Sequence, residues 1–211
     1  MLTFEQHQAL AEIYRRIKDK KYSITRIQVI LSGKGFNKNV LSQLGNQDLL
    51  EKTTKTIILT KKGLETAYHT YRTFVVLGIF CQEILGLSRK EAEEHIQDIF
   101  FSINNYLLEK YCALIGHSLV NNIPRGNCCT RAELETSEQV IPLSKLPLNT
   151  PATVMYIKTQ NQGSVQKIFD LGIYPGQTIK IFQHYPIYIV QVDKGEVALE
   201  QIAASNIFVK K

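Results

Sequence analysis

Apolar residues recur at helical spacing through the first fifty positions of the chain. Thr3 can cap a first helix, with Gln6 at the capping-box position. Ser23 can cap a second, short helix. The glycine turn "SGKG" follows, and a third helix is predicted from Phe36 to about Leu50. The segment "KTTKTIILT" then has the β-branched residues and polar middle of a small hairpin. Three short helices followed by a hairpin predict a winged helix-turn-helix.

The predicted third helix has two different faces. Val40, Leu41 and Leu44 share one side and should pack inward. The other side carries hydrogen-bonding side chains of the kind that contact base edges and phosphates, and no carboxylate interrupts it before Asp48. Lysines of the hairpin suit phosphate contacts. The residues that we expect to contact DNA are Arg26, Lys38, Asn39, Ser42, Gln43, Asn46, Lys52 and Lys55.

Two long apolar helices should follow. The first lies within residues 64–86, and its second half is apolar almost all round, which predicts burial on several sides. The second begins after Ser88, with Glu91 at capping-box spacing, and runs through "RKEAEEHIQDIFFSINNYLLEKYCALIG" with a broad apolar face. A second copy of the chain is the simplest partner for this surface, because proteins that read DNA half-sites are usually two-fold dimers. The expected dimer-interface residues are Phe74, Leu77, Phe100 and Phe101.

The last third of the chain changes character. Residues 124–150 are rich in Pro, Ser, Thr and charge, which indicates a linker. Beyond them, "ATVMYIK", "QTIKIFQ", "YIVQVDK" and "EVALEQ" have the pattern of short strands, with a helix at "GSVQKIFDLG", and predict a small SH3-like barrel. The predicted fold is therefore α+β and multidomain. Its parts are a winged helix over 1–63, a helical dimerisation domain over 64–127, a linker over 128–147 and the barrel over 148–211.

Formal charge is unevenly distributed within the total of +6. Residues 1–75 hold 13 Lys and Arg against 6 Asp and Glu, residues 76–140 hold 5 against 9, and residues 141–211 hold 7 against 4. A basic head followed by an acidic middle is typical of a nucleic-acid binder with a separate pairing or sensing region. A merely solvated basic surface would carry the same charge.

Several other classes of protein are disfavoured by the sequence. The longest apolar run, residues 74–81, is too short to cross a bilayer, and the N-terminus has no hydrophobic signal core, so we expect a cytoplasmic protein without a membrane partner. Four cysteines are too few for a disulfide scaffold at this length. No catalytic serine elbow, Walker loop, His-Glu-x-x-His or dinucleotide glycine pattern is present, so we expect no enzymatic activity.

Several motifs occur together in a recognisable order. "LTKKGLETA" (59–67) follows the predicted wing, "EILGL" (83–87) lies at the break between the long helices, and "LIGH…IPRGN" follows the second of them. With these motifs the chain resembles the diphtheria-toxin-repressor family of metal-dependent transcription regulators. "FDLGIYPGQTIKI" and "VALEQIAASNIFV" make its C-terminal part similar to an FeoA-type domain. The resemblance covers nearly the whole chain and implies a homodimer that binds an operator when Fe²⁺ or Mn²⁺ is bound.

The metal ligands that the resemblance implies do not carry over. The family has a ligand on its N-terminal helix, His and Glu on its first dimerisation helix, and His, Cys or Glu and a Glu-His pair on the second. Phenylalanine cannot coordinate Fe²⁺ or Mn²⁺, which prefer oxygen and imidazole donors, so the usual sites should be absent. The matching positions of this chain hold Gln8, Phe74, Gly78, Glu93, Gln97, Phe100 and Phe101.

Two other groups of residues could bind a metal instead. His95 shares a helix face with Glu91 and Asp98, although a solvated charged face has the same composition. Thiolates of the second group would select Zn²⁺, Cu⁺ or an iron–sulfur cluster, and the same cysteines could also serve as small buried hydrophobes. The second group is Cys112, His117, Cys128 and Cys129.

Two functional hypotheses follow from the sequence. The first is a dimeric DNA-binding transcription regulator, a repressor in the manner of the family, acting in iron, metal or redox homeostasis with an atypical effector site. The second is an interaction module of ferrous iron transport, in which the FeoA-like barrel is the active part and the winged helix docks to protein. The basic head favours the first hypothesis. Loss of affinity for duplex DNA with rising salt would distinguish the two.

Overall fold

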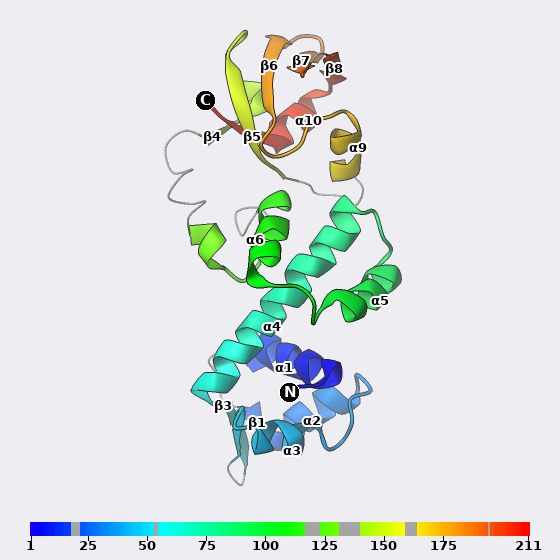
Figure 1. Cartoon of the computed structure of the whole chain (residues 1–211), viewed down its shortest axis with the longest axis vertical. Helices are drawn as coiled ribbons and strands as arrows, with labels where there is room; N and C mark the ends of the chain where they lie inside the picture. The colour runs from blue at the N-terminus through cyan, green and yellow to red at the C-terminus, as the bar shows by residue number, and fades with distance from the viewer. Residues whose placement is uncertain (18–21, 53–54, 117–122, 131–139, 159–163, 194) are drawn as a thin grey trace. The chain divides into compact units, whose positions relative to one another are not determined.

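The computed structural model describes residues 1–17, 22–52, 55–116, 123–130, 140–158, 164–193 and 195–211. They form two compact units, Met1–Val75 and Val76–Lys211. The first unit contains helices and a small sheet, and the second contains helices and a larger antiparallel sheet (Figure 1). The predicted α+β multidomain class is therefore confirmed. In the described part of the chain, none of the helices has both the length and the apolarity that crossing a bilayer requires.

The first unit is a winged helix, which we call the head. Its sheet has the order β1-β3-β2, and the β2–β3 hairpin is the wing. The predicted capping box is confirmed, because Thr3 Oγ1 accepts from the Gln6 N–H and Gln6 Oε1 accepts from the Thr3 N–H. The elements of the head are α1 (Phe4–Ile17), β1 (Tyr22–Ser23), α2 (Ile24–Ser32), α3 (Val40–Asn46), β2 (Leu50–Lys52), β3 (Thr56–Leu59) and the start of α4 (Lys61–Ile79).

The third helix is shorter than predicted because a longer turn precedes it. Gly35 has a left-handed φ of 81°. The side-chain oxygen of Asn37 accepts a hydrogen bond from the N–H of Asn39 (2.9 Å), which is an Asx turn that competes with the helix. α3 therefore begins only at Val40. Lys38 lies in the turn that leads into α3, and Asn39 occupies its N-cap position.

The helical part of the second unit has more breaks than predicted. The capping box of Ser88 and Glu91 is present as predicted. The single long helix expected after it is instead divided, because Asn104 accepts a hydrogen bond from the N–H of Leu107 (2.9 Å) and so caps a new helix. The elements here are the end of α4, the π-helical turn η1 (Phe80–Ile84), α5 (Arg89–Ile99) and α6 (Asn105–Leu114).

The sheet of the second unit contains two strands that were not predicted, β4 and β9. Its order is β4-β9-β5-β6-β7-β8, and every neighbouring pair is antiparallel. Register shifts in the pairing of β5 with β9 and of β6 with β7 bend the sheet toward a barrel. The elements are β4 (Val140–Pro142), η2 (Leu143–Lys145), β5 (Pro151–Ile157), α9 (Ser164–Asp170), β6 (Thr178–Gln183), β7 (Tyr188–Val192), β8 (Gly195–Leu199), α10 (Gln201–Asn206) and β9 (Ile207–Lys210).

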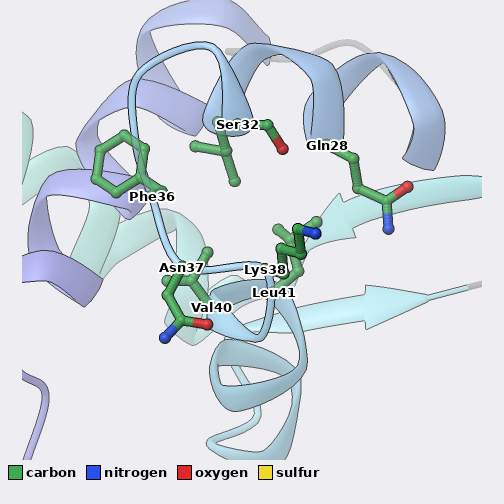
Figure 2. Close-up of a pocket in the computed structure, with 8 residues that line it drawn as sticks. Gln28, Ser32, Phe36, Asn37, Lys38, Val40 and Leu41 are labelled. Carbon is green, nitrogen blue, oxygen red and sulfur yellow. The ribbon is translucent and has the colours of Figure 1, made fainter.

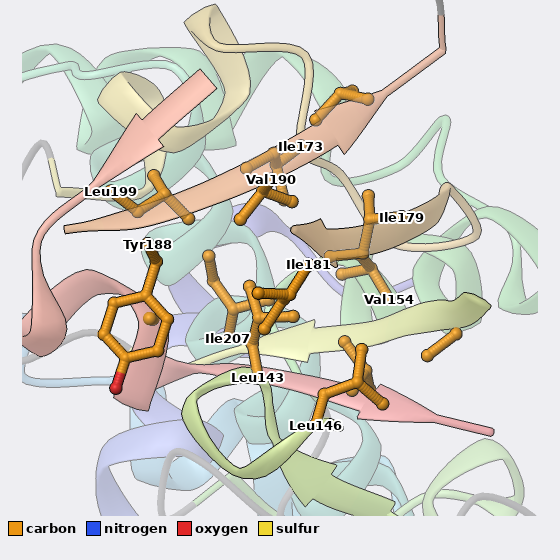
Figure 3. Packing of buried hydrophobic residues seen from close by; sticks show 14 of the residues in the cluster. Leu143, Leu146, Val154, Ile173, Ile179, Ile181, Tyr188, Val190, Leu199 and Ile207 are labelled. Atoms are coloured by element: carbon orange, nitrogen blue, oxygen red, sulfur yellow. The ribbon is translucent and has the colours of Figure 1, made fainter. Parts of the chain in front are cut away.

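The barrel begins earlier than the predicted boundary at residue 148. Leu143 and Leu146 are fully buried in its core, beside strand residues such as Ile181 (Figure 3). β4 also pairs with β9, which places residues 140–142 in the sheet. At the other end of the predicted linker, residues 127–130 form a helical turn whose two cysteines are buried, and residues 131–139 lie outside the described residues. The Pro, Ser and Thr residues of this region predicted a linker, but parts of the region form a short strand and a helical turn.

Candidate nucleic-acid interface and candidate metal centre

Arg26 of α2, the turn before α3, α3 itself and the wing present polar side chains to solvent. Val40, Leu41 and Leu44 are buried as predicted, which fixes the rotation of α3 and turns its polar side outward. The Nζ of Lys52 donates to the Oγ of Ser42 (3.4 Å), so the wing and α3 meet on this surface. We call it the polar face of the head. It consists of the eight predicted DNA contacts, all of them exposed: Arg26, Lys38, Asn39, Ser42, Gln43, Asn46, Lys52 and Lys55.

A side chain of α1 orients one residue of the polar face. The Nε2 of Gln6 donates to the Oε1 of Gln43 (3.1 Å), and Gln6 is only 6 % exposed. The other end of the same amide closes the capping box on Thr3. Because the Gln6 amide is buried and has two hydrogen-bond partners, it has little freedom to move. It therefore holds the side chain of Gln43 in one position. The capping pattern predicted Gln6 as a cap but gave no sign of this second contact.

Two carboxylates of α1 hold the turn between α2 and α3. Glu5 Oε1 accepts from the backbone N–H of Asn37 (2.7 Å). Glu12 forms ion pairs with Arg15 (3.0 Å), Arg16 (3.1 Å) and Lys34 (3.2 Å). Burial raises the pKa of Glu12, but hydrogen bonds from the three cations outweigh burial and leave that pKa below its usual value. The turn that carries Lys38 is therefore tied to a rigid helix.

Replacing Glu12 by Gln should destabilise the protein by about 1–3 kcal/mol, because three cations lose their common partner. Since the pKa of Glu12 is lowered in the folded state, its contribution is present above the usual value of 4.5 and is lost as the pH falls through the folded-state pKa. Chemical denaturation followed by circular dichroism at pH 7 and pH 3 measures both effects. Glu93→Gln is the matched control, because its pair with Arg89 is exposed and should contribute less than about 0.5 kcal/mol. Equal losses for the two variants would contradict the prediction.

A hollow of about 250 Å³ lies between α2 and the start of α3 (Figure 2). Its walls offer amides, a hydroxyl, one ammonium group and apolar side chains, but no carboxylate, imidazole or thiol. It is therefore unsuited to a metal ion, and it shares Lys38 with the polar face. The lining residues are Gln28, Leu31, Ser32, Phe36, Asn37, Lys38, Val40 and Leu41.

At three of the positions where the resemblance implies metal ligands, aromatic packing is found instead. Phe74 meets Phe4 edge to face, with ring centroids 5.6 Å apart. Phe100 meets Phe101 in the same way at 5.2 Å. Glu93 is an exposed carboxylate paired with an arginine on its own helix. Gln8 and Gln97 are exposed, and Gly78 has no side chain.

His95 lies on the exposed side of α5. The side chain of Ser88, and after it the backbone N–H of Ser88 that the Glu91 carboxylate accepts (2.8 Å), lower the pKa of Glu91. Among the residues that the structure describes, His95, Glu91 and Asp98 do not come close enough together to form a three-ligand group. The predicted His95 alternative therefore has no support in the geometry.

Three of the four residues of the predicted cysteine group are brought together. Cys112 comes from α6, and Cys128 and Cys129 come from the helical turn at 127–130. The Sγ of Cys129 lies 3.7 Å from that of Cys112 and 3.9 Å from that of Cys128, and all three sulfurs lie within 4.8 Å of one another. All three are buried, and none of them is joined in a disulfide. The group can hold a metal ion. His117, its fourth predicted member, lies outside the described residues.

The predicted dimer-interface residues differ in exposure. Leu77 is fully buried and Phe100 is 8 % exposed, so these two side chains already have neighbours within the chain. Phe74 is partly buried against Phe4. Phe101 is 56 % exposed, so of these four residues it has the most exposed side chain with which to contact a second chain.

Comparisons with known proteins support the domain at the C-terminus. Residues 141–211 match the family model described as the FeoA domain, so the barrel is an FeoA domain, as predicted. It is similar to the crystal structure of an iron uptake regulatory protein, FeoA, at 25 % identity, covering 34 % of this chain and 95 % of that chain with a TM-score of 0.32. No curated protein matches the chain.

Similarity to solved structures also extends over the whole chain. One of these is IdeR of T. acidophilum, at 14 % identity, covering 100 % of this chain and 98 % of that chain with a TM-score of 0.42. Another is the manganese regulator SloR, at 15 % identity, covering 100 % of both chains with a TM-score of 0.43.

Proposed function

We propose that this protein is a homodimeric, DNA-binding transcription regulator and not an enzyme. The observation that carries the proposal is the polar face of the head. It combines amides and hydroxyls on α3 with lysines on the wing, in the part of the chain where Lys and Arg outnumber Asp and Glu by 13 to 6. Amides and hydroxyls suit base edges, and lysines suit phosphates. Binding to chromosomal DNA would place the protein in the cytoplasm, as the sequence predicts.

The arrangement of the polar face suggests that different residues contact phosphates and bases. Lys38, Lys52 and Lys55 would neutralise phosphates along the groove edges, while Asn39, at the N-cap of α3, would enter the major groove. The contacts of Glu5 and Glu12 with the turn, and of Gln6 with Gln43, would hold these side chains in one arrangement before binding.

Affinity for duplex DNA should fall steeply and linearly on a logarithmic scale as the salt concentration rises, because binding releases counterions from phosphates. Lys38→Ala should weaken binding to all sequences alike and reduce the salt slope by about one. Fluorescence anisotropy with a labelled duplex library measures both quantities. Lys90→Ala is the control, since Lys90 is an exposed lysine of α5 and should leave the slope unchanged.

Asn39→Ala should act differently from Lys38→Ala. Loss of a base contact should reduce discrimination between sites by about 1–3 kcal/mol while leaving the salt slope intact. If both variants weaken binding to every sequence equally, Asn39 does not contact a base and the polar face does not enter the groove as proposed.

A second candidate function is favoured by the FeoA domain itself. An interaction module of ferrous iron transport would use the barrel as its active part and the head for protein docking. In that case the full chain would show no measurable affinity for duplex DNA at any salt concentration, with or without added metal. The salt series therefore decides between the two functions.

We further propose that the effector is not a divalent ion at the usual positions of the resembled family, because phenylalanines occupy three of them and Gly78, which has no side chain, a fourth. Mn²⁺ or Fe²⁺ would then leave the affinity for DNA unchanged.

A further inference from the structure

We propose that Cys112, Cys128 and Cys129 bind one thiophilic divalent ion, Zn²⁺ among the common ones, through three thiolates. Metal binding at this site is inferred from the positions of the three sulfurs alone. Only the use of the site as a sensor rests on the proposed regulatory function.

The sulfur positions suit one ion. Two ligands of a tetrahedral zinc with Zn–S bonds of about 2.3 Å lie about 3.8 Å apart. The separations of Cys129 Sγ from the other two sulfurs are 3.7 and 3.9 Å, and all three sulfurs lie within 4.8 Å of one another. Closing the remaining pair around one ion requires a side-chain movement of less than about 1 Å. In a cubane iron–sulfur cluster each thiolate bonds a different iron, and its sulfurs must lie further apart than ligands of the same ion. The geometry therefore favours a single ion over a cubane cluster.

The donors and their burial narrow the choice of ion. An all-sulfur set excludes the hard ions Mg²⁺, Ca²⁺ and Mn²⁺, which prefer oxygen. Cys112 and Cys129 are 0 % exposed and Cys128 is 7 % exposed, so net charge at the site is costly. Three thiolates with Zn²⁺ carry a net charge of about −1, whereas with Cu⁺ they carry about −2. The divalent ion leaves less charge buried and is favoured.

The number of ligands indicates how the ion would be held. Structural zinc sites have four protein ligands, while sites with three keep one position open to an exogenous ligand. Among the described residues the site has three ligands, and a three-thiolate set predicts an ion that exchanges, as a sensor requires, rather than a permanently enclosed one.

Binding would also connect two separate pieces of chain. Cys112 in α6 and Cys129 in the helical turn are 17 positions apart in sequence, and this turn directly precedes the segment that leads to the FeoA domain. An ion that joins them would close this loop and restrain the end of the helical region.

The test uses the full chain, reduced, freed of metal by a chelator and titrated with Zn²⁺ alone. We expect one ion per chain, with release of about three protons on binding, because each thiol must lose its proton. Cys112→Ser, Cys128→Ser and Cys129→Ser should each lower the affinity at least about 100-fold. Cys81→Ser is the matched control: Cys81 is also a buried cysteine outside any disulfide but lies outside the group, so its replacement should leave the zinc affinity and the proton release unchanged.

Substitution by Co²⁺ gives a second readout, since sulfur-to-cobalt charge-transfer absorption should fall by about one third in each single variant that still binds. Absence of stoichiometric Zn²⁺ binding to the wild-type chain, with fewer than two protons released, would overturn the proposal even if the variants misfold. Preferential binding of Cu⁺, or of iron together with sulfide, would overturn the choice of ion. Zinc binding without any affinity for DNA would instead refute the proposed DNA-binding function and would still support the zinc site.

Discussion

Replacing Gly63 by Ala will unfold the head or destabilise it by more than about 3 kcal/mol, the largest stability effect that we expect from a single methyl group. A Cβ at this position would lie 1.9 Å from the carbonyl oxygen of Leu49 and 2.8 Å from its carbonyl carbon. Both of these atoms belong to the backbone, so no side-chain rotation can relieve the overlap. The start of α4 and the entry to the wing would have to move apart.

The contacts around Gly63 explain why such a movement is costly. The Oγ1 of Thr60 accepts from the Gly63 N–H (2.9 Å) and donates to the carbonyl oxygen of Asp48 (2.7 Å). The N–H of Thr60 donates to the carbonyl oxygen of Leu49 (3.2 Å). Lys62 Nζ donates to the carbonyl oxygen of Gln47 (3.0 Å). Separating α4 from this turn would break several of these hydrogen bonds at once.

Thermal and urea unfolding followed by circular dichroism will measure the effect of Gly63→Ala. Gly78→Ala is the matched control in the same helix, because its new Cβ would meet only the Gln82 amide at 3.9 Å. Helix propensity predicts that this control will be more stable than the wild type by about 1 kcal/mol. A Gly63→Ala variant within 1 kcal/mol of the wild type would mean that the close approach to Leu49 does not exist.

Local rules of sequence predicted much of this fold correctly. The capping boxes at Thr3 and Ser88 depend only on side chains within four residues, and both are present. The inward face of α3 followed from the spacing of three apolar residues. The motif "LTKKG" was recognised from the family alone. Its physical reason, the contact of Gly63 with Leu49, becomes visible only when the wing is folded against α4.

The elements that the sequence did not predict depend on distant partners. β9 lies between β4 and β5, so neither β4 nor β9 is a strand until a distant segment pairs with it. Asn104 interrupts a helical pattern that apolar spacing alone would continue. The cysteines were candidates from their chemistry, but their spacing in sequence matches no familiar metal motif. Only the packing of α6 against the turn at 127–130 brings their sulfurs together.

Replacing Phe101 by Asp will convert the proposed dimer to monomers, raising the dissociation constant at least about 100-fold. Phe101 is 56 % exposed, and its neighbours along the chain are exposed apolar residues as well: Ile99, Tyr106 and Leu107. Such a group around the α5–α6 turn is typical of an interface, and aromatic residues contribute most to interface affinity. Because the side chain is exposed in the single chain, Asp at this position should not prevent folding.

Light scattering and sedimentation equilibrium at micromolar concentration will measure the assembly. Ile202→Asp is the control, because Ile202 is 74 % exposed on α10 of the FeoA domain and should leave the dimer intact. Monomers should also lose affinity for a two-half-site operator far more than for a single half-site, since one chain reads only half of a two-fold site. A monomeric wild-type chain would refute the proposed dimer. A Phe101→Asp variant that remains dimeric would show that the two chains pair through another surface.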